Sequence, residues 1–400
     1  MNTFRRNGMT AIMAVVISLC AACAASTDAS QSASQGTVRT YYIAADEVNW
    51  DYVPTGIDQV TGKPLNADEA PDQTRGPLRI GHIYRKAIYR EYTDATFKHL
   101  KPRPLSEQYL GMLGPIIHAE VGDTIRVVFK NNASRPYSMH PHGVLYKKAS
   151  EGVGYNDGRA ASEHGGDAVL PGHTFTYEWD VPERAGPGPN DPSSIVWLYH
   201  SHVDEMKDTA SGLIGAIIVT RRGMARPDGT PKDVDREFVT LFDIVDENQS
   251  WYFDHNVQTY TGNPKAVMAD ATRLQVDPED ANGNFSLFGR GFTDSNLKFT
   301  INGFVYGNGP KMVMKEGDHV RWYVVTIGNG LNFHTPHWHG NTVLVAGQRT
   351  DVLNIAPAQM ITADMMPDNP GTWLFHCHIS DHMMGGMSAL YTVEPATADP

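Results

Sequence analysis

The residues best suited to chemistry lie near the C-terminus, where segment 373–387 carries three histidines, one cysteine and three methionines. The segment begins with Trp-Leu-Phe, which predicts a strand, and successive side chains of a strand point to opposite faces. His376 and His378 should therefore point one way and Cys377 the other. The two faces would then hold two different metal sites, joined through the backbone of Cys377.

The cysteine face offers the ligands of a blue-copper electron-transfer site. Such a site takes one thiolate, two imidazoles and a weak axial thioether. Cys377, His382 and Met387 supply all but one of these ligands, so a further imidazole must come from elsewhere in the chain. One-electron oxidation at this site would feed the neighbouring histidine site, where multi-electron chemistry becomes feasible.

Three further histidine groups can supply the remaining imidazoles. They are His140-Pro141-His142, His200-Ser201-His202 and His334-Thr335-Pro336-His337-Trp338-His339. A single His-x-His pair is often a surface coincidence, but ten of the 17 histidines fall into these four groups. The only cysteine after the N-terminal leader lies in one of them as well. The pattern therefore predicts copper binding rather than scattered structural histidines.

The four groups resemble the copper-binding motifs of multicopper oxidases. This resemblance implies four coppers per subunit, namely one type 1 copper, one type 2 copper and a type 3 pair. The type 1 ligands would be His334, Cys377, His382 and Met387. The type 2 ligands would be His140 and His337. The type 3 ligands would be His142, His200, His202, His339, His376 and His378.

In this family, the type 2 copper and the type 3 pair form a trinuclear cluster. Single electrons pass from the type 1 site to this cluster, where O2 is reduced to water. By the resemblance, Cys377 would be the electron gate, and His376 and His378 would be its exits. The implied partners are therefore O2 and a small-molecule or metal-ion reductant.

Length and sequence repetition predict two domains. Four hundred residues exceed what one hydrophobic core usually holds. The run Trp-Leu-Tyr-His that begins at Trp197 is restated as Trp-Leu-Phe-His at Trp373. Segment 236–256 restates the first expected strand, which begins at Val38, and no convincing amphipathic helix is present.

Together with the resemblance, this repetition implies an all-β protein with two cupredoxin-like Greek-key β-sandwich domains, at residues 38–222 and 235–395. The second domain carries Cys377 where the first has Ser201, so the first domain lacks a blue copper. Its four histidines can then serve only a shared cluster. The resemblance to small two-domain laccases implies a head-to-tail homotrimer with each cluster between subunits. A monomer with an internal cluster is the alternative.

Residues 1–25 have the features of an export signal, with two arginines, a short apolar run and small residues. Ala22 before Cys23 permits lipoprotein cleavage and a lipid anchor at Cys23, whereas ordinary cleavage is the alternative because Cys20 occupies the usual leucine position. Residues 26–37 are expected to form a flexible linker. The protein is thus expected in the periplasm or cell envelope, or as a secreted protein. The net charge of −12 argues against a nucleic-acid partner.

A closer resemblance covers nearly the whole mature chain. Segments such as Lys-Asp-Thr-Ala-Ser-Gly-Leu-Ile-Gly, from residue 207, look like one two-domain repeat of ceruloplasmin and hephaestin. This resemblance implies oxidation of metal ions, chiefly Fe(II), alongside phenols and amines. Asp381 matches an iron ligand of that family, Asp294 stands where the family has a glutamate, and Phe299 replaces its histidine. Asp381 is alternatively a loop carboxylate or a hydrogen-bond partner of His382.

Some roles stay open at this point. Tyr146 matches an electron-donating tyrosine of small laccases, or else it is a strand residue in the domain wall. A group of methionines suits Cu(I) or forms an apolar surface for electron entry. These methionines are Met360, Met365, Met366, Met383 and Met384.

Two other functions compete with the oxidase. A copper nitrite reductase is disfavoured by Ser201 and by the eight cluster histidines. A copper-sequestration protein without turnover would not need histidines on both sides of Cys377, an arrangement suited to electron transfer.

Overall fold

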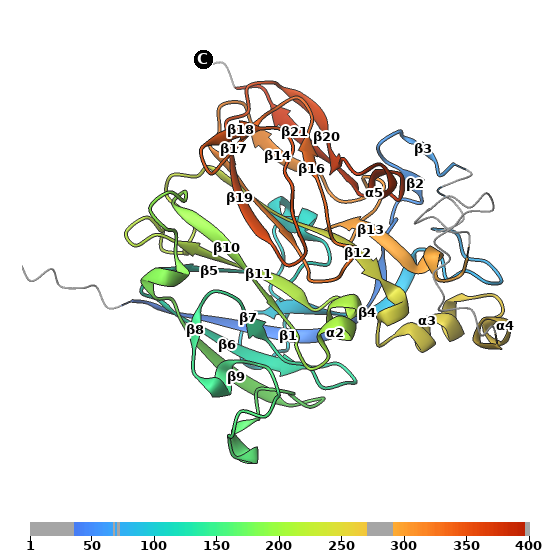
Figure 1. Cartoon of the computed structure of the whole chain (residues 1–400), viewed down its shortest axis with the longest axis horizontal. Helices are drawn as coiled ribbons and strands as arrows, with labels where there is room; N and C mark the ends of the chain where they lie inside the picture. The colour runs from blue at the N-terminus through green and yellow to red at the C-terminus, as the bar shows by residue number, and fades with distance from the viewer. Residues whose placement is uncertain (1–35, 67–68, 70–72, 270–290, 397–400) are drawn as a thin grey trace, which may run out of the picture. The chain divides into compact units, whose positions relative to one another are not determined.

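The computed structural model describes residues 36–66, 69, 73–269 and 291–396, and strands form most of its regular structure (Figure 1). The predicted export signal, with Cys23, lies outside the described residues, as does nearly all of the predicted linker. Within the described part, no helix is long and apolar enough to cross a membrane.

The first half of the chain forms two sheets. Their strands are β1 (Val38–Asp51), β4 (Ile83–Tyr92), β5 (Ile116–Glu120), β6 (Thr124–Asn131), β7 (His140–Pro141), β8 (Leu145–Tyr146), β9 (Thr174–Asp180), β10 (Ser194–His200) and β11 (Ile214–Thr220). One sheet has the order β4-β1-β6-β9-β8 and the other the order β5-β11-β10-β7. A small ribbon of β2 (Ile57–Asp58) and β3 (Lys63–Pro64) stands apart from both.

The second half forms two further sheets. Their strands are β12 (Arg236–Asp246), β13 (Leu297–Ile301), β14 (Met312–Lys315), β15 (Val320–Thr326), β16 (Pro336–Trp338), β17 (Val343–Val345), β18 (Gln348–Thr350), β19 (Met360–Met365), β20 (Gly371–Cys377) and β21 (Ser388–Glu394). The orders are β13-β12-β15-β19-β17-β18 and β14-β21-β20-β16. Apart from the additional β18, these orders match those of the first half strand by strand.

Burial explains why these segments are strands. In β6, buried residues alternate with half-buried ones, as expected for a strand with one face on a core. In contrast, β11 and β15 are buried along their whole lengths, as expected for strands covered on both faces, and the buried residues of β15 include Arg321. One core cluster contains Val196 and Leu198 from β10 together with Phe238 and Trp322 from the second half, so apolar packing is continuous between the halves.

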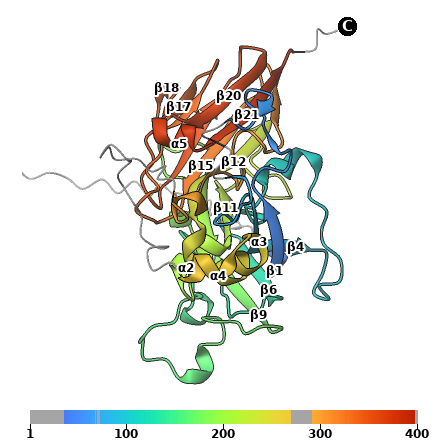
Figure 2. The same cartoon turned by 90° about the vertical axis from the view of Figure 1, so that its right-hand side faces the viewer.

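The structure confirms the all-β class but adds short helices that the sequence analysis did not anticipate. They are α2 (Glu205–Ser211), α3 (Phe253–Tyr260), α4 (Pro264–Ala269) and α5 (Ser380–Met384). Figure 2 shows α3 and α4 beside each other. The expected strand over 236–256 is wrong beyond Asp246, because the Asp246 side chain accepts a hydrogen bond from the backbone of Asn248 and starts a turn. The predicted domain bounds stay a prediction.

Glu47 on β1 links the first half to Tyr252, and its hydrogen bonds make stability depend on pH. Burial alone would raise its pKa, but contacts from Ser134, Arg85 and Tyr252 lower the pKa to about 2, from a usual 4.5. Because the folded state has the lower pKa, this stabilisation is complete above about pH 4.5 and is lost as the pH falls towards 2. We therefore expect the difference in melting temperature between the wild type and Glu47→Gln to narrow between pH 5 and pH 3. A constant difference across that range would contradict this account.

Candidate metal centre

Cys377, His334 and His382 converge at the end of β20, and all three side chains are buried. The Cys377 Sγ lies 3.5 Å from His382 Nδ1 and 4.0 Å from His334 Nδ1. The two Nδ1 atoms are 3.2 Å apart. Three donor atoms therefore face one small volume, with no carboxylate among them, which suits a soft cation such as copper.

Asn332, which the sequence analysis missed, selects the ring nitrogen that His334 presents. Its Oδ1 lies 3.0 Å from His334 Nε2, so the Nε2–H donates to it and Nδ1 is left for a metal. The Asn332 side chain is held in turn by the Ile244 amide, at 2.8 Å, and by Asp243 Oδ1, at 2.9 Å. No sequence motif marks an asparagine two residues before a histidine as functional.

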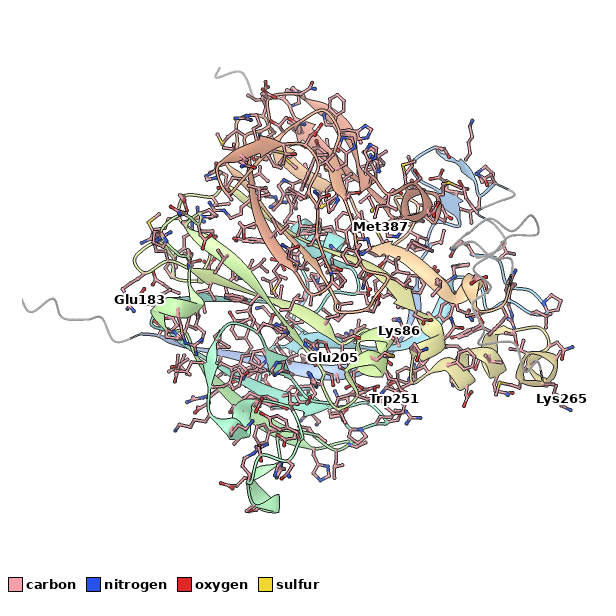
Figure 3. The ribbon with its side chains drawn as sticks, in the orientation of Figure 1. Lys86, Glu183, Glu205, Trp251, Lys265 and Met387 are labelled. Atoms are coloured by element: carbon pink, nitrogen blue, oxygen red, sulfur yellow. The ribbon has the colours of Figure 1, made fainter. Side chains whose placement is uncertain are left out.

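Backbone hydrogen bonds hold the two segments that carry Cys377 and Met387. The Thr335 amide donates to Cys377 Sγ at 3.3 Å, and the Cys377 amide donates to the Met387 carbonyl at 3.1 Å. Met387 is fully buried at this end of the second half (Figure 3). Burial raises the pKa of the Cys377 thiol, whereas hydrogen bonds from Thr335 and Ile379 lower it. Because the thiolate is the metal ligand, a cation that binds here displaces the thiol proton.

On the other face of β20, His376 belongs to a second group. The rings of His337, His339, His376 and His378 form one connected group, in which His337 and His376 each contact the other three, and the closest centroids, those of His337 and His339, are 4.6 Å apart. His376 Nδ1 lies 2.8 Å from the Cys377 carbonyl, so Nε2 is the free nitrogen. That Nε2 is 3.2 Å from His337 Nδ1 and 3.0 Å from His339 Nε2. The side chains of Cys377 and His376 thus face apart, as the strand pattern predicts.

The first half holds a matching group of four rings. These are His140, His142, His200 and His202, with neighbouring centroids 5.2–5.6 Å apart. His142 Nε2 and His200 Nε2 are 3.1 Å apart. His140 Nδ1 contacts the Glu151 carbonyl at 2.8 Å and His200 Nδ1 contacts the Ser201 carbonyl at 3.0 Å, so Nε2 is available on both. The hydrogen bond of His200 repeats that of His376.

A glycine follows each of two His-x-His pairs for a steric reason. Gly143 and Gly340 both have φ near +74°, a backbone conformation that other residues rarely adopt. A Cβ on Gly143 would lie 2.2 Å from the Trp197 ring, and one on Gly340 would lie 2.5 Å from the Trp373 ring. Each tryptophan therefore packs directly on the turn that carries the histidine pair.

The buried rings in these groups are neutral at neutral pH. Burial lowers the pKa of His142, His376 and His382 to about 4 and that of His200 and His334 to about 3. Neutral imidazole is the form that binds metal ions. Little proton release is therefore needed at these histidines, and the donor set fits copper.

The two groups of four histidines remain separate within the described residues. Ring contacts and short nitrogen–nitrogen distances occur inside each group, and none joins His140, His142, His200 or His202 to a histidine of the second half. Within one chain, then, each group is half of the expected eight-histidine cluster.

The other predicted site residues lie as follows. The Tyr146 ring is 6.0 Å from the His140 ring, beside the first group. Asp381 lies in α5, directly before His382, and is half-buried. Asp294 is buried at the turn before β13, and the Phe299 ring packs 5.6 Å from the His382 ring. No contact that the structure describes joins the two carboxylates.

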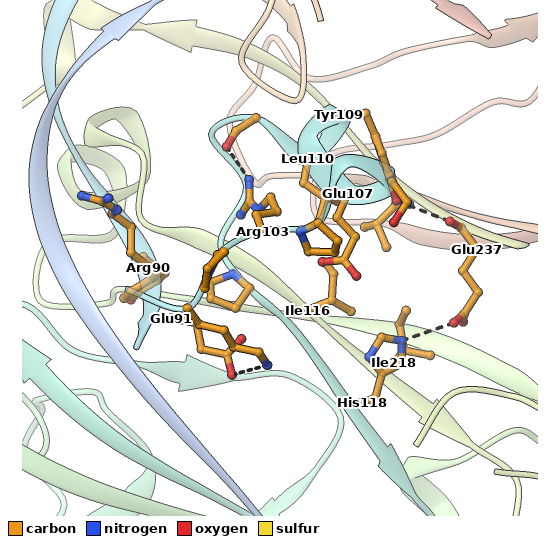
Figure 4. Close-up of a pocket in the computed structure, with 18 of the residues that line it drawn as sticks. Arg90, Glu91, Arg103, Glu107, Tyr109, Leu110, Ile116, His118, Ile218 and Glu237 are labelled. Atoms are coloured by element: carbon orange, nitrogen blue, oxygen red, sulfur yellow. Dashed lines mark hydrogen bonds and ion pairs between the residues drawn. The ribbon is translucent and has the colours of Figure 1, made fainter. Parts of the chain in front are cut away.

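A large cavity lies apart from these groups. It has a volume of about 970 Å³, and none of the clustered histidines lines it. Figure 4 shows the His118 ring facing Glu237, with His118 Nε2 3.3 Å from a carboxylate oxygen, whereas Arg103 donates to backbone carbonyls. The cavity offers no ligand set for copper.

Comparison with known sequences identifies the family. Two sequence models, both described as multicopper oxidase, match residues 107–224 and 281–397, together more than half of the chain. The chain is 44% identical to ferroxidase HEPHL1 of Homo sapiens over 91% of its length, and 41% identical to hephaestin of Mus musculus over 92%. It is 39% identical to ceruloplasmin of Homo sapiens over 89%. It spans about 30% of the length of each of these relatives.

Solved structures agree in fold. A multicopper oxidase structure matches with a TM-score of 0.53 and 19% identity, covering 90% of each chain. A copper nitrite reductase from Nitrosomonas europaea matches with a TM-score of 0.51 and 16% identity, covering 91% of this chain and 96% of that one. At such identities the fold alone is shared, so the sequence models decide between the two classes. The chain belongs to the multicopper oxidase family.

Proposed function

We propose that this protein is an oxidase that removes single electrons from a reductant at the Cys377 site and reduces O2 to water at a cluster of eight histidines. The carrying observation is that Cys377 faces His334 and His382 on one side of β20, while His376 faces a histidine group on the other. Bound copper would supply the redox chemistry at both sites. The ligands would be those assigned by resemblance, with four coppers per subunit.

The chain itself provides a short electron path between the sites. Cys377 is bonded through its backbone to His376 and His378, and its carbonyl oxygen accepts a hydrogen bond from His376 Nδ1 at 2.8 Å. Asn332 and Thr335 orient the groups on the cysteine side. The proposed role of Tyr146 is that of a single-electron donor to the cluster, and its ring contact with His140 supports this role.

We further propose that copies of the chain assemble head to tail as a homotrimer, with each cluster between subunits. The separation of the two histidine groups within one chain supports this assembly, because all eight must meet at one site. A heterologous interface that closes into a ring brings the first group of one copy to the second group of the next.

The proposed reductant is a metal ion, with Fe(II) first. Relatives named ferroxidase support this choice, and two hard carboxylates support it as well: Asp381 directly precedes His382, and Asp294 lies at the turn before β13, the strand that carries Phe299. Phe299 cannot replace the family's imidazole ligand, and it packs on His382 instead. Cu(I) is a second candidate because Met366, Met383 and Met384 are exposed thioethers, whereas Met365 is buried.

Replacing Asp381 with alanine tests the iron assignment. We expect kcat/KM for Fe(II) to fall roughly 10-fold, equivalent to about 1.4 kcal/mol, because one hard ligand and one negative charge are lost. Oxidation of a methoxyphenol should change little. Oxygen uptake by the copper-loaded protein, compared with Fe(II), Cu(I) and the phenol, measures all three. Asp94→Ala, which removes an exposed charge elsewhere, is the matched control.

Equal losses with Fe(II) and the phenol would contradict a substrate role for Asp381 and indicate a general effect on His382. Unchanged rates with all three reductants would place the iron site elsewhere. A preference for the phenol, unaffected by the substitution, would make the protein a small laccase on a ceruloplasmin-like frame.

We propose that the protein is exported to the periplasm or cell envelope, or secreted. The charged, apolar and small-residue order of segment 1–25 supports export, and Cys23 is the proposed site of a lipid anchor. Globomycin, which blocks lipoprotein signal cleavage, should leave an unprocessed precursor if Cys23 is acylated, and it should have no effect on ordinary cleavage.

A further inference from the structure

Asp208 in α2 is a buried carboxylate outside the assigned ligands, yet it is bound directly to the turn that carries two of them. Its side chain is fully buried. One oxygen accepts hydrogen bonds from Ser201 Oγ at 2.7 Å, the Val203 amide at 3.0 Å and the Asp204 amide at 3.2 Å. The other oxygen accepts from Trp251 Nε1 at 2.8 Å. Among the residues that the structure describes, four donors and no cation thus converge on this one carboxylate.

The two halves differ at the residue between the paired histidines, and Asp208 contacts that residue in the first half. Ser201 lies between His200 and His202, as Cys377 lies between His376 and His378. The Ser138 amide donates to Ser201 Oγ at 3.0 Å, just as the Thr335 amide donates to the Cys377 sulfur. In the second half the sulfur faces two imidazoles, whereas in the first half the hydroxyl donates to a carboxylate. Asp208 therefore occupies the side of Ser201 on which a blue copper would lie.

These contacts fix the histidine turn from several directions. Ser201 is held through its side chain, and Val203 and Asp204 through their amides, so the backbone on both sides of His202 is tied to one carboxylate. The His202 amide donates to Ser138 Oγ at 3.0 Å, and His200 Nδ1 contacts the Ser201 carbonyl. A shift of Asp208 would thus turn both ring nitrogens away from their group.

Trp251 connects this network to the second half of the chain. It follows β12 in the chain. Its ring makes cation–π contacts with Lys207 and Arg135, whose Nζ and Cζ atoms lie 4.3 and 4.4 Å from the ring centroid. Figure 3 shows Trp251 near α2. The neighbouring Lys86 Nζ donates to the Ala210 carbonyl at 2.8 Å and anchors the same helix. The helix that carries Asp208 is therefore held by contacts that involve none of the proposed metal ligands.

We propose that Asp208 is a positioning residue for O2 reduction, which holds His200 and His202 in their metal-binding orientation through Ser201. This inference rests on the proposed oxidase function. Groups that orient metal ligands typically contribute 10- to 100-fold to metal affinity or activity when they are removed. In the first half, a buried carboxylate beside Ser201 would thus orient the two histidines, whereas in the second half the corresponding place beside Cys377 would hold the blue copper.

Asp208→Asn is the direct test, because the amide keeps the shape but replaces one acceptor oxygen with an NH2 donor. That NH2 must then meet a donor, either Trp251 Nε1–H or the three donors on the other side. We expect copper content to fall below four per subunit and oxygen uptake to fall by about 10- to 100-fold. The blue absorption should persist, because its ligands lie in the second half.

Adding Trp251→Phe should rescue the Asp208→Asn variant, because it removes the Nε1–H donor that the new NH2 group would otherwise face. In Asp208→Asn/Trp251→Phe the amide oxygen can face Ser201, Val203 and Asp204, and the NH2 no longer faces a donor. We expect the double variant to regain most of the copper content and uptake rate that Asp208→Asn loses. Asp123→Asn is the matched control, since Asp123 is also a buried acceptor of several hydrogen bonds, and its donors, Thr37, Arg39 and Glu120, lie outside the histidine groups.

Three results would overturn the inference. The first is an Asp208→Asn variant with unchanged copper content and rate. The second is equal loss of copper in Asp208→Asn and Asp123→Asn, in step with their melting temperatures, which would indicate a role in packing only. The third is the absence of rescue by Trp251→Phe. Copper content tests the inference even if the wild type consumes no oxygen, a result that would refute the proposed function alone.

Discussion

Cys377→Ser is expected to abolish the blue absorption and to reduce oxygen uptake, with every reductant, to the level of the copper-free protein. A hydroxyl cannot supply the thiolate that carries the electron from the reductant. The fold should persist because a serine is accommodated at the corresponding position of the first half. There Ser201 is buried and accepts a hydrogen bond from the Ser138 amide. Visible absorption, oxygen uptake and far-ultraviolet circular dichroism measure the three outcomes.

The remaining copper provides the internal control for this variant. The eight histidines are unchanged, so three of the four proposed coppers should still bind. Turnover that survives in a folded Cys377→Ser protein would show that electrons reach the cluster by another route, and it would refute the role given to Cys377.

Two inactive variants are expected to restore activity when they are co-expressed. His140→Ala/His142→Ala damages the first histidine group and His337→Ala/His339→Ala damages the second. In a head-to-tail ring, an interface between the intact second group of one variant and the intact first group of the other contains all eight histidines. Random mixing makes about a quarter of the interfaces complete, so oxygen uptake should reach about a quarter of the wild-type rate.

Each variant expressed alone is the control and should be inactive, although each retains the type 1 ligands. If both variants fold and associate but the co-expressed protein is as inactive as each variant alone, the cluster must lie within one chain. Such a result would favour the monomer with an internal cluster.

Much of this site could be predicted from the sequence because its geometry is local. Residues that alternate along β20 must face apart, so the alternation alone assigns Cys377 and His376 to different faces. The strand expected from Val38 matches β1.

The parts that could not be predicted depend on contacts between distant segments. Asn332 and Asp208 carry no motif, and their meaning comes from His334 and Ser201, which only the fold brings to them. The strand after Arg236 ends early because the Asp246 side chain competes with the sheet for a backbone amide. Spacing could not show that Phe299 packs on His382, since the two are more than 80 residues apart.

The central claim is that this chain couples one-electron oxidation to complete reduction of O2. The most direct measurement is the ratio of Fe(II) oxidised to O2 consumed by the copper-loaded protein, with hydrogen peroxide assayed in the same solution. The account predicts four Fe(II) per O2 and no peroxide, because four electrons and four protons convert O2 to two waters. A ratio of two with stoichiometric peroxide, or copper binding without any oxygen consumption, would contradict it.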